Sequence, residues 1–403
     1  MATPFTLGGE QRVVSIISNS LIESGYDVTI MCTDMSAIRN NKLYNLSEKV
    51  KIGYVRGFNN KIVKKIRSKR WDMYYDNLKT GKYKNNLPVL KFINCDFITQ
   101  MLLVNAFNKE NFDYVISLST IYNTMLACIS DKLNAKTIGW QHGSFEQSFL
   151  QKDKGHYNQN KFTKYMFKKL DKYVVLTQHD KKLIKQKFNE NVLVINNPKS
   201  MTSNKVTNLE NKQFLAVGRF SEEKNFSLLI DMFNEYHKIN KEWKLAIVGE
   251  GELKEEYNKK IKEYNLQKFV SIKKFTNKIS KHYLNSSVYL MSSFYEGWGM
   301  VIGEAIEFGL PVISFDISSA PEMIKDGYNG YIVNKNSLNK YVDSMIKISS
   351  DETLLKEFSQ NSKIFSSNFD NKIVIKRWID MFNNLDKLET EEYVKKGYVI
   401  VNN

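Results

Sequence analysis

Short apolar and β-branched segments alternate with helical segments along this chain, and the alternating series runs twice. In the first series the apolar segments lie at 27–32, 51–55, 112–118, 136–140, 172–176 and 192–195. In the second series they lie at 214–217, 244–248, 269–273, 288–291, 311–315 and 331–333. Such alternation is typical of parallel sheets with helices on both faces. The sequence therefore predicts an α/β protein with two doubly wound, Rossmann-like domains.

The polar segment Asn196–Asn211 separates the two series. It contains Pro198 and shows no apolar periodicity, as expected of a linker. The chain has 403 residues, which is about the length of two ordinary domains. We therefore expect an N-terminal domain at 1–200 and a C-terminal domain at 201–370. Residues 371–403 are expected to form a helical segment that can pack on either domain, including back on the N-terminal one.

The composition excludes several classes of protein. The net charge of +16 favours anionic partners, but no zinc-finger, RNP or basic-region motif accompanies it, so we expect no nucleic-acid partner. No run of about 18 apolar residues offers a membrane span, and the N-terminus lacks the features of a secretion signal. We therefore expect a cytoplasmic protein. Its three widely spaced cysteines argue against both a disulfide framework and a zinc site.

The segment Ser292–Asp316 reads as a strand end, a glycine-rich loop, a helix and the next strand. Gly297 and Gly299 allow the backbone to approach a ligand closely, and the start of the helix favours anions. Glu296 lies in the loop and Glu304 in the helix, and each carboxylate can accept two hydrogen bonds from vicinal hydroxyls. Two solvated charges are the plain alternative. Apolar residues surround Glu304, however, and indicate a buried carboxylate that needs partners.

A second cluster lies in Phe214–Phe226, where Arg219 and Lys224 follow the end of a strand. An arginine fork and a lysine point charge together match a diphosphate whose negative charge must be held as it leaves. A surface salt bridge of Arg219 with Glu222 or Glu223 is the alternative interpretation.

Together these segments resemble the nucleotide-sugar domain of the family 4 glycosyltransferases, which belong to the glycosyl transferases group 1 and have the GT-B fold. The family carries two glutamates eight residues apart, matched by Glu296 and Glu304. It also carries Gly-Arg with a lysine five residues after the arginine, matched by Arg219 and Lys224. Further matches lie at 247–253, 309–313 and 321–333. The resemblance extends over nearly the whole chain and implies two Rossmann-like domains facing across a cleft.

The resemblance implies a role for each of these residues toward a nucleotide-sugar donor. Arg219 and Lys224 would hold the diphosphate. Glu304 would bind the ribose and Glu296 the transferred sugar. The donor site would be completed by backbone groups of Gly297, Trp298, Gly299, Met300 and Val301.

In the first domain, Leu7–Val14 resembles the glycine turn of the family, in which Gly8 and Gly9 approach the donor phosphates; a plain turn is the alternative. His142 follows a predicted strand and matches the histidine that the family places beside the reacting sugar, although a lone histidine is more often structural. The family usually has an apolar strand before the glycine turn. Only Met1–Leu7 precede it here, so this strand is either short or cut away at its start.

Retaining members of the family act without a protein nucleophile, and the leaving diphosphate guides the acceptor to the same face of the sugar. The resemblance therefore implies a retaining hexosyltransferase whose donor is a nucleotide-diphosphate sugar, with a UDP-sugar favoured. The acceptor would be a glycan, a lipid-linked acceptor or a cell-surface polysaccharide. No DxD-like metal motif is present in a matching loop, and two cations can replace a metal at the diphosphate, so we expect no metal and no cofactor.

The segment Lys61–Arg70 has six cations among ten residues, followed by Trp71, Tyr74 and Tyr75. A solvated basic face is the commoner explanation of such a run. A basic amphipathic surface with aromatic neighbours can also rest on an anionic membrane, which would place the protein at the cytoplasmic membrane face.

Two other functions remain open. A sugar-nucleotide epimerase or a phosphorylase can use the same two-domain fold, because a fold does not fix a function. A non-catalytic partner subunit that binds nucleotide sugars is the second alternative.

Overall fold

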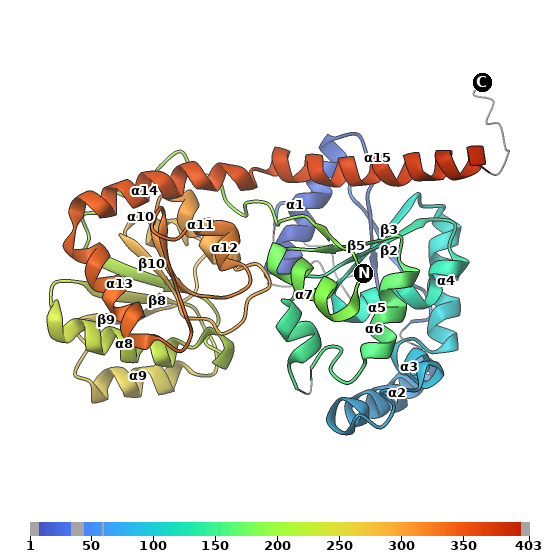
Figure 1. Cartoon of the computed structure of the whole chain (residues 1–403), viewed down its shortest axis with the longest axis horizontal. Coiled ribbons are helices and arrows are strands. Elements are labelled where there is room, and N and C mark those ends of the chain that lie inside the picture. Colours follow the sequence, from blue (N-terminus) through green and yellow to red (C-terminus); the bar gives the residue numbers. More distant parts are fainter. Residues whose placement is uncertain (1–7, 34–43, 59, 153, 396–403) are drawn as a thin grey trace. The chain divides into compact units, whose positions relative to one another are not determined.

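The computed structural model describes residues 8–33, 44–58, 60–152 and 154–395, and it divides the chain into two compact units (Figure 1). Unit 1 comprises Met1–Pro198 and Asn371–Asn403, and unit 2 comprises Lys199–Asp370. The chain therefore passes from one unit to the other twice, after residue 198 and again after residue 370.

Unit 2 contains a six-stranded parallel sheet in the order β12-β11-β10-β7-β8-β9. Its strands are β7 Gln213–Val217, β8 Lys244–Val248, β9 Val270–Lys273, β10 Val288–Met291, β11 Val312–Phe315 and β12 Gly330–Val333. Its helices are α8 Phe226–Ile239, α9 Lys254–Glu263, α10 Ser280–Leu284, α11 Met300–Glu307, α12 Ala320–Met323, α13 Leu338–Ser350 and α14 Glu352–Ser366. Figure 1 shows α8, α9 and α13 on one face of the sheet and α10, α11 and α12 on the other.

The sheet of unit 2 is buried on both faces. All four residues of β10 and of β11 are buried, as expected of central parallel strands covered by helices. The strand order reverses between β7 and β10, so the loops after these two strands leave the sheet on opposite faces. Ligands of open α/β sheets bind at this place, beyond the carboxyl ends of the strands.

Among its described strands, unit 1 has a two-stranded sheet, β1-β2, and a four-stranded sheet, β3-β4-β5-β6, both parallel. The strands are β1 Thr29–Cys32, β2 Lys51–Tyr54, β3 Tyr114–Leu118, β4 Lys136–Trp140, β5 Lys172–Val175 and β6 Leu193–Val194. The helices are α1 Gly9–Glu23, α2 Lys61–Thr80, α3 Leu87–Asn94, α4 Phe97–Glu110, α5 Ser119–Ile129, α6 Asn160–Lys169, α7 Gln178–Phe188 and α15 Asn371–Lys395.

The two sheets of unit 1 do not hydrogen-bond to each other among the described residues. A hollow of about 560 Å³ is lined by β1 and β3 together with α1 residues such as Val14 and Ile17. The strand that the sequence analysis expects within Met1–Leu7 lies outside the described residues. The six strands that the sequence predicts for this unit at 27–195 are all present, and they are divided between two sheets.

Helix α15 packs on the other elements of unit 1. Trp378 meets Trp140 edge to face with ring centroids 4.8 Å apart, and Phe382 stacks on Tyr114 at 4.5 Å. Arg377 Nη1 donates a hydrogen bond of 2.7 Å to Asn196 Oδ1. The last helix is thus bound to the same unit as the first.

Each strand that the alternating pattern predicts is present, with ends within two residues of the predicted ones. The prediction of an α/β protein with two Rossmann-like domains is confirmed. Buried strands in parallel sheets are continuously apolar and are bounded by polar turns, which explains why this pattern could be read from the sequence.

Candidate functional site

Lys224 and Glu296 form an ion pair at the carboxyl edge of the unit 2 sheet. Lys224 ends a 3₁₀ turn after β7, and Glu296 lies in the loop after β10. Because β7 and β10 are neighbours in the sheet, Lys224 Nζ reaches Glu296 Oε1, with side chains 16% and 13% exposed. Ser293 Oγ donates a second hydrogen bond of 2.9 Å to the same oxygen. The sequence analysis assigned both residues to the donor site, and the structure brings them together.

Arg219 lies in the same loop as Lys224 but extends toward solvent. Its side chain is 80% exposed, and Nη2 donates to Glu223 Oε1 at 3.2 Å. This is the salt bridge that the sequence analysis considered as the alternative. An exposed ion pair contributes little to stability, so Arg219 can exchange Glu223 for an anionic ligand at low cost.

The glycine-rich loop leads directly into α11. Gly299 has φ +68° and precedes the first residue of the helix, a conformation that favours glycine. The α11 residues Met300 and Val301 present the first backbone N–H groups of the helix, which attract anions. The Trp298 side chain is buried and packs edge to face on Phe369 at 5.4 Å. A ligand would therefore meet the backbone of this loop rather than the Trp298 ring.

Glu304 is buried in α11 and is held by two hydroxyls. Ser200 Oγ donates to Oε1 at 2.7 Å, and Tyr283 OH donates to Oε2 at 2.7 Å. The sequence analysis predicted a buried carboxylate here, which is confirmed. It missed both partners, because Ser200 lies in the linker and Tyr283 in the short helix α10, and no sequence pattern joins these positions to Glu304.

Buried Tyr289 lies within electrostatic reach of both glutamates. Burial raises the pKa of Tyr289 well above its usual value, and the negative charges of Glu296 and Glu304 raise it further. Tyr289 OH donates to the backbone oxygen of Val217 at 3.2 Å, at the end of β7. The two glutamates thus border the same small region although they are eight residues apart.

The sequence analysis also missed a third cation near the glycine-rich loop. Lys335 Nζ donates to the backbone oxygen of Phe294 at 2.7 Å and lies 5.0 Å from the centre of the Tyr295 ring. It follows β12, which is not a neighbour of β10 in the sheet. Lys335 therefore adds positive charge next to the loop that carries Glu296.

In unit 1, Gly8 and Gly9 lie at the start of α1. The Gly8 N–H donates to Tyr44 OH at 2.8 Å, so this backbone group already has a protein partner. A Cβ on Gly8 would come within 2.1 Å of Gln11 Oε1, the end of a flexible side chain. This is the geometry of a turn that starts a helix.

His142 follows β4, and its ring lies 4.3 Å from that of Trp140. Burial lowers the pKa of His142 to about 3, so the imidazole is neutral at pH 7. Its buried Nε2 has no hydrogen-bond partner among the described residues. A neutral imidazole with an unused nitrogen can exchange a hydrogen bond with a sugar hydroxyl, but it cannot supply a positive charge.

The basic segment Lys61–Arg70 forms the first half of α2, and the structure corrects two expectations about it. Arg70 does not belong to the exposed basic face: it is buried and lies 3.5 Å from the buried Asp96. Tyr74 is also buried, with its OH donating to the backbone oxygen of Gly155 at 2.6 Å. Both side chains point inward because they lie on the face of α2 that packs on α3 and on the loop before α6. The exposed cations of the segment are Lys61, Lys64, Lys65 and Lys69.

Within the part of the chain that the structure describes, no cluster of three or more His, Cys, Asp or Glu side chains has the geometry to bind a metal ion. Over the same residues, no single helix is long and apolar enough to cross a membrane; only the bent pair α3 and α4, with 59° between its helices, passes by length and composition.

Residues 200–365 match the profile of the protein family described as glycosyl transferases group 1. The matched range covers most of unit 2, including Lys224, Glu296 and Glu304. The segment that carries the candidate site is therefore similar to the glycosyl transferases group 1, over less than half of the chain.

Relatives of this chain include AmsD of Erwinia amylovora, an amylovoran biosynthesis glycosyltransferase. The two chains are 37% identical over 222 residues, a match that covers 53% of this chain and 62% of AmsD. The chain thus spans less than two thirds of that relative. An uncharacterized glycosyltransferase of Haemophilus influenzae is 26% identical over 380 residues, or 92% of this chain and 95% of the relative.

Among solved structures, HepE of Anabaena in complex with UDP and glucose superimposes with a TM-score of 0.70 at 14% identity. The match covers 94% of this chain and 97% of HepE. At this level of identity the likeness concerns the fold alone, and it shows that this chain has the GT-B fold.

Proposed function

We propose that this chain is a glycosyltransferase of family 4 that moves a sugar from a nucleoside diphosphate sugar to a glycan, a lipid-linked acceptor or a cell-surface polysaccharide. The observation that carries the proposal is the pairing of Lys224 with Glu296 in the loop before α11, eight residues before the buried Glu304. A cation, a carboxylate and a helix N-terminus meet there, and they match a diphosphate, a sugar hydroxyl pair and a phosphate oxygen respectively.

Each residue has a separate task in this proposal. Lys224 and Arg219 neutralise the diphosphate as it leaves, and Glu304 accepts hydrogen bonds from the ribose. When the diphosphate of the donor binds Lys224, the ion pair between Lys224 and Glu296 loosens. Glu296 then binds the hydroxyls of the transferred sugar. His142 exchanges a neutral hydrogen bond with the sugar.

The proposed reaction proceeds with retention. The bond between the anomeric carbon and the diphosphate oxygen breaks, and the acceptor oxygen bonds to the same face of that carbon. The acceptor hydroxyl gives its proton to the leaving diphosphate. The protein contributes positioning and charge stabilisation rather than a nucleophile. We further propose that Lys224 and Arg219 make a metal ion unnecessary, so that chelation leaves turnover unchanged.

The donor class can be found by incubating the full chain with UDP-, GDP- and ADP-sugars and measuring nucleotide release with and without acceptors. We expect a UDP-sugar to be used, in line with the UDP and glucose bound by HepE. Proton NMR of the product would show whether the anomeric configuration is retained. An absence of both transfer and hydrolysis with every donor, together with nucleotide binding, would favour the non-catalytic partner subunit. Interconversion of sugar epimers would favour an epimerase.

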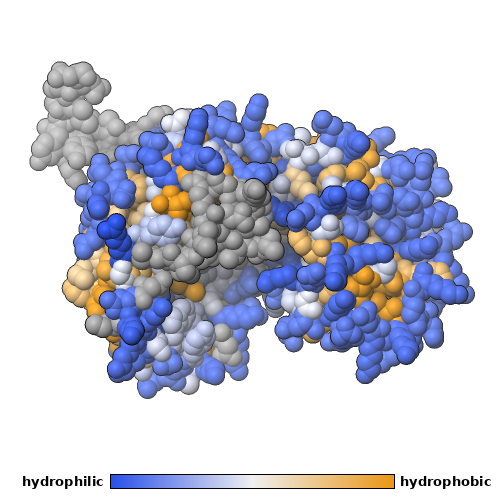
Figure 2. Space-filling view, turned by 180° about the vertical axis from the view of Figure 1, so that it is seen from behind, coloured by the Kyte–Doolittle hydropathy of each residue, from blue (hydrophilic) through white to orange (hydrophobic). Residues whose placement is uncertain are grey.

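We also propose that unit 1 rests on an anionic lipid surface, which would place a lipid-linked or membrane-bound acceptor near the enzyme at the cytoplasmic face. Phe97 and Met101 lie one turn apart on α4 and are exposed, Phe97 by 72%. Tyr75 on α2 and Phe92 on α3 are exposed as well. Figure 2 shows hydrophobic side chains, in orange, at the outer edge of unit 1 over α4.

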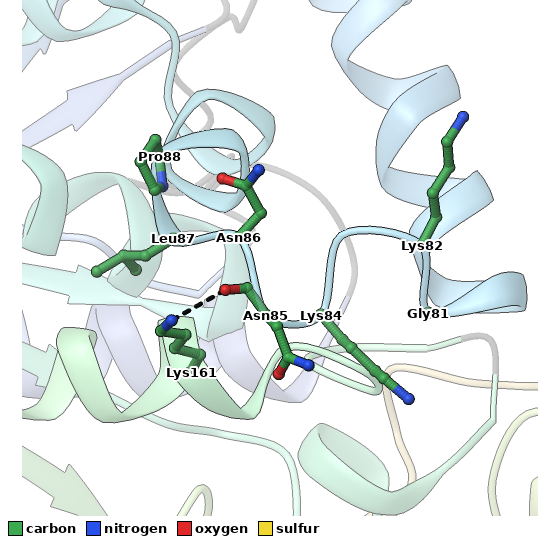
Figure 3. Close-up of a pocket in the computed structure, with 8 residues that line it drawn as sticks. All are labelled: Gly81, Lys82, Lys84, Asn85, Asn86, Leu87, Pro88 and Lys161. Carbon is green, nitrogen blue, oxygen red and sulfur yellow. Dashed lines mark hydrogen bonds between the residues drawn. The ribbon is translucent and has the colours of Figure 1, made fainter.

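Exposed lysines lie on the elements that precede α3 and α4 in the chain. Four lie on α2, and the loop that joins α2 to α3 adds Lys82 and Lys84. Lys82, Lys84 and Lys161 line a pocket of about 410 Å³ beside the start of α3 (Figure 3). Lys161 Nζ donates to the backbone oxygen of Asn85 at 2.9 Å. Basic residues near an anionic membrane contribute about 1 kcal/mol each, and exposed aromatic residues insert at its interface. A soluble polyanion would account for the lysines but not for Phe97 and Met101.

A further inference from the structure

The buried carboxylate of Glu304 is fixed from two sides by hydroxyl groups of unit 2. Ser200 Oγ holds Oε1 and Tyr283 OH holds Oε2, both at 2.7 Å. A charged acceptor makes such hydrogen bonds short and strong. The two hydroxyls therefore determine the plane of the carboxylate, and with it the direction in which further hydrogen bonds can be accepted.

Each of the two hydroxyls is itself rigidly placed. The Tyr283 ring is buried and stacks on Phe308 with ring centroids 5.3 Å apart and an interplanar angle of 3°. Ser200 lies in the linker between Lys199 and Ser203, and both of these residues bind Glu307, three residues after Glu304 on α11. Lys199 Nζ lies 2.7 Å from Glu307 Oε2, and the Ser203 N–H donates to Oε1 at 2.8 Å.

Glu307 anchors the linker firmly because it is a buried, fully partnered anion. Lys363 Nζ also donates to its Oε1 at 2.7 Å, and Ser366 Oγ to its Oε2 at 2.8 Å. Burial alone would raise the pKa of Glu307, but the hydrogen bonds from Lys199, Lys363, the Ser203 N–H and Ser366 together outweigh it and lower the pKa. The linker therefore carries Ser200 to Glu304 in a fixed geometry.

We propose that Ser200 and Tyr283 are positioning residues that orient the Glu304 carboxylate for the 2′- and 3′-hydroxyls of a ribose. This inference rests on the proposed function, in which Glu304 binds the ribose. A carboxylate can accept roughly four hydrogen bonds, so the two protein hydroxyls and a diol can share it. Without the protein hydroxyls the side chain can rotate, and its preference for a ribose over a 2′-deoxyribose is lost.

The test compares the affinity of the full chain for UDP and for 2′-deoxy-UDP by calorimetry, with ADP and GDP and their 2′-deoxy forms in parallel. The wild type should prefer the ribonucleotide about tenfold, as expected when a hydrogen bond to a charged group is lost. The double variant Ser200→Ala, Tyr283→Phe should bind both forms within roughly twofold of each other. Ser200→Thr keeps a hydroxyl and should retain most of the preference.

Two matched controls separate positioning from a general effect on folding. Ser203→Ala removes a hydroxyl that bonds Lys205 rather than Glu304, and Tyr236→Phe removes a buried hydroxyl that bonds Ser349. Both should keep the wild-type preference. In turnover the double variant should raise KM for the donor and change kcat little.

An unchanged preference in the folded double variant, or an equal loss in the two controls, would overturn the inference while leaving the proposed function intact. A wild type that binds ribose and 2′-deoxyribose forms equally would overturn the inference and the ribose role of Glu304, while leaving the proposed glycosyl transfer intact. A wild type that binds none of the nucleoside diphosphates would overturn the proposed function and the inference together.

Discussion

Lys224 and Glu296 are 72 residues apart in the chain, yet Lys224 Nζ contacts Glu296 Oε1 because β7 and β10 are neighbouring strands. The pair is mostly shielded from water, so its two charges interact more strongly than an exposed pair would. A diphosphate that binds Lys224 must compete with Glu296, and a sugar that binds Glu296 must compete with Lys224. The pair therefore keeps the two proposed contact points of the donor in place before the donor arrives.

Removing Lys224 should mainly affect catalysis. In the proposed reaction Lys224 stabilises the charge developing on the diphosphate, so we expect kcat of Lys224→Ala to fall roughly 10²- to 10³-fold. Initial-rate assays with the preferred donor would measure this. Lys260→Ala is the matched control, because Lys260 forms a half-buried ion pair with Asp231 at 2.7 Å between α8 and α9. Equal losses of kcat in the two variants would contradict the role of Lys224.

Removing Arg219 should weaken donor binding without affecting stability. The guanidinium is exposed and pairs only with Glu223 in the contacts that the structure describes, so Arg219→Ala should leave the thermal midpoint unchanged. The KM for the donor should rise about tenfold, as expected for a lost charge-assisted hydrogen bond. Lys238→Ala removes another exposed ion pair, with Glu235, and should change neither quantity. If the KM of Arg219→Ala equals that of the wild type, Arg219 serves only in the surface salt bridge with Glu223.

Acid should destabilise unit 1 through its buried histidines. Burial lowers the pKa of His156 from 6.5 to about 3, so between these values the unfolded chain binds a proton that the folded chain does not. Stability due to this group is therefore complete above pH 6.5 and falls by about 1.4 kcal/mol for each pH unit below it. His142 acts in the same direction.

The variant His156→Gln tests this dependence, because glutamine does not titrate. Urea unfolding at pH 7 and pH 5 should show a loss of stability that is roughly 2 kcal/mol smaller in the variant than in the wild type. His179→Gln removes an exposed histidine that pairs with Glu146 at 2.7 Å, so it should not make this loss smaller. Identical pH dependence in all three proteins would contradict the assignment.

Arg70 should act as a core residue of unit 1 rather than as part of the basic surface. Arg70→Met leaves Asp96 buried without its ion-pair partner and should lower the free energy of unfolding by about 3–5 kcal/mol. Its neighbour Lys69 is exposed, and Lys69→Met should change the free energy of unfolding by less than about 0.5 kcal/mol. Urea unfolding measures both. Similar small effects would show that the Arg70–Asp96 pair is dispensable.

The proposed lipid surface can be tested by co-sedimentation with phosphatidylcholine vesicles prepared with and without phosphatidylglycerol. The double variant Phe97→Ser, Met101→Ser should bind anionic vesicles about tenfold more weakly, because it loses apolar area that enters the interface. Lys64→Glu, Lys65→Glu should weaken binding to anionic vesicles to a similar extent.

The control for the vesicle experiment is Ile364→Ser. Ile364 is 64% exposed on α14 of unit 2, so it matches Phe97 in exposure but lies outside the proposed surface. The Ile364→Ser variant should bind vesicles as the wild type does. Equal binding of the wild type to neutral and anionic vesicles would remove the proposal, and binding to a soluble polyanion alone would assign the lysines to an anionic polymer instead.

The strands and the buried position of Glu304 could be predicted from the sequence because they depend on local patterns. A parallel strand buried on both faces must be apolar along its length, and an apolar helix around Glu304 indicates burial. The sequence placed Arg70 in a basic run with Tyr74 nearby, and such a run is usually solvated. It does not show that Asp96, 26 residues later, accompanies Arg70 into the core.

The sequence by itself determined the order of strands and helices, the division into two α/β domains, and the residue types of the proposed donor site in the second of them. Only the tertiary structure decided which of these residues touch. The neighbouring positions of β7 and β10 join Lys224 to Glu296, and the path of the linker over α11 brings Ser200 to Glu304. The physical reason is that apolar periodicity specifies which faces are buried, whereas contacts between polar side chains depend on strand order and on the course of loops, which carry no periodic signal.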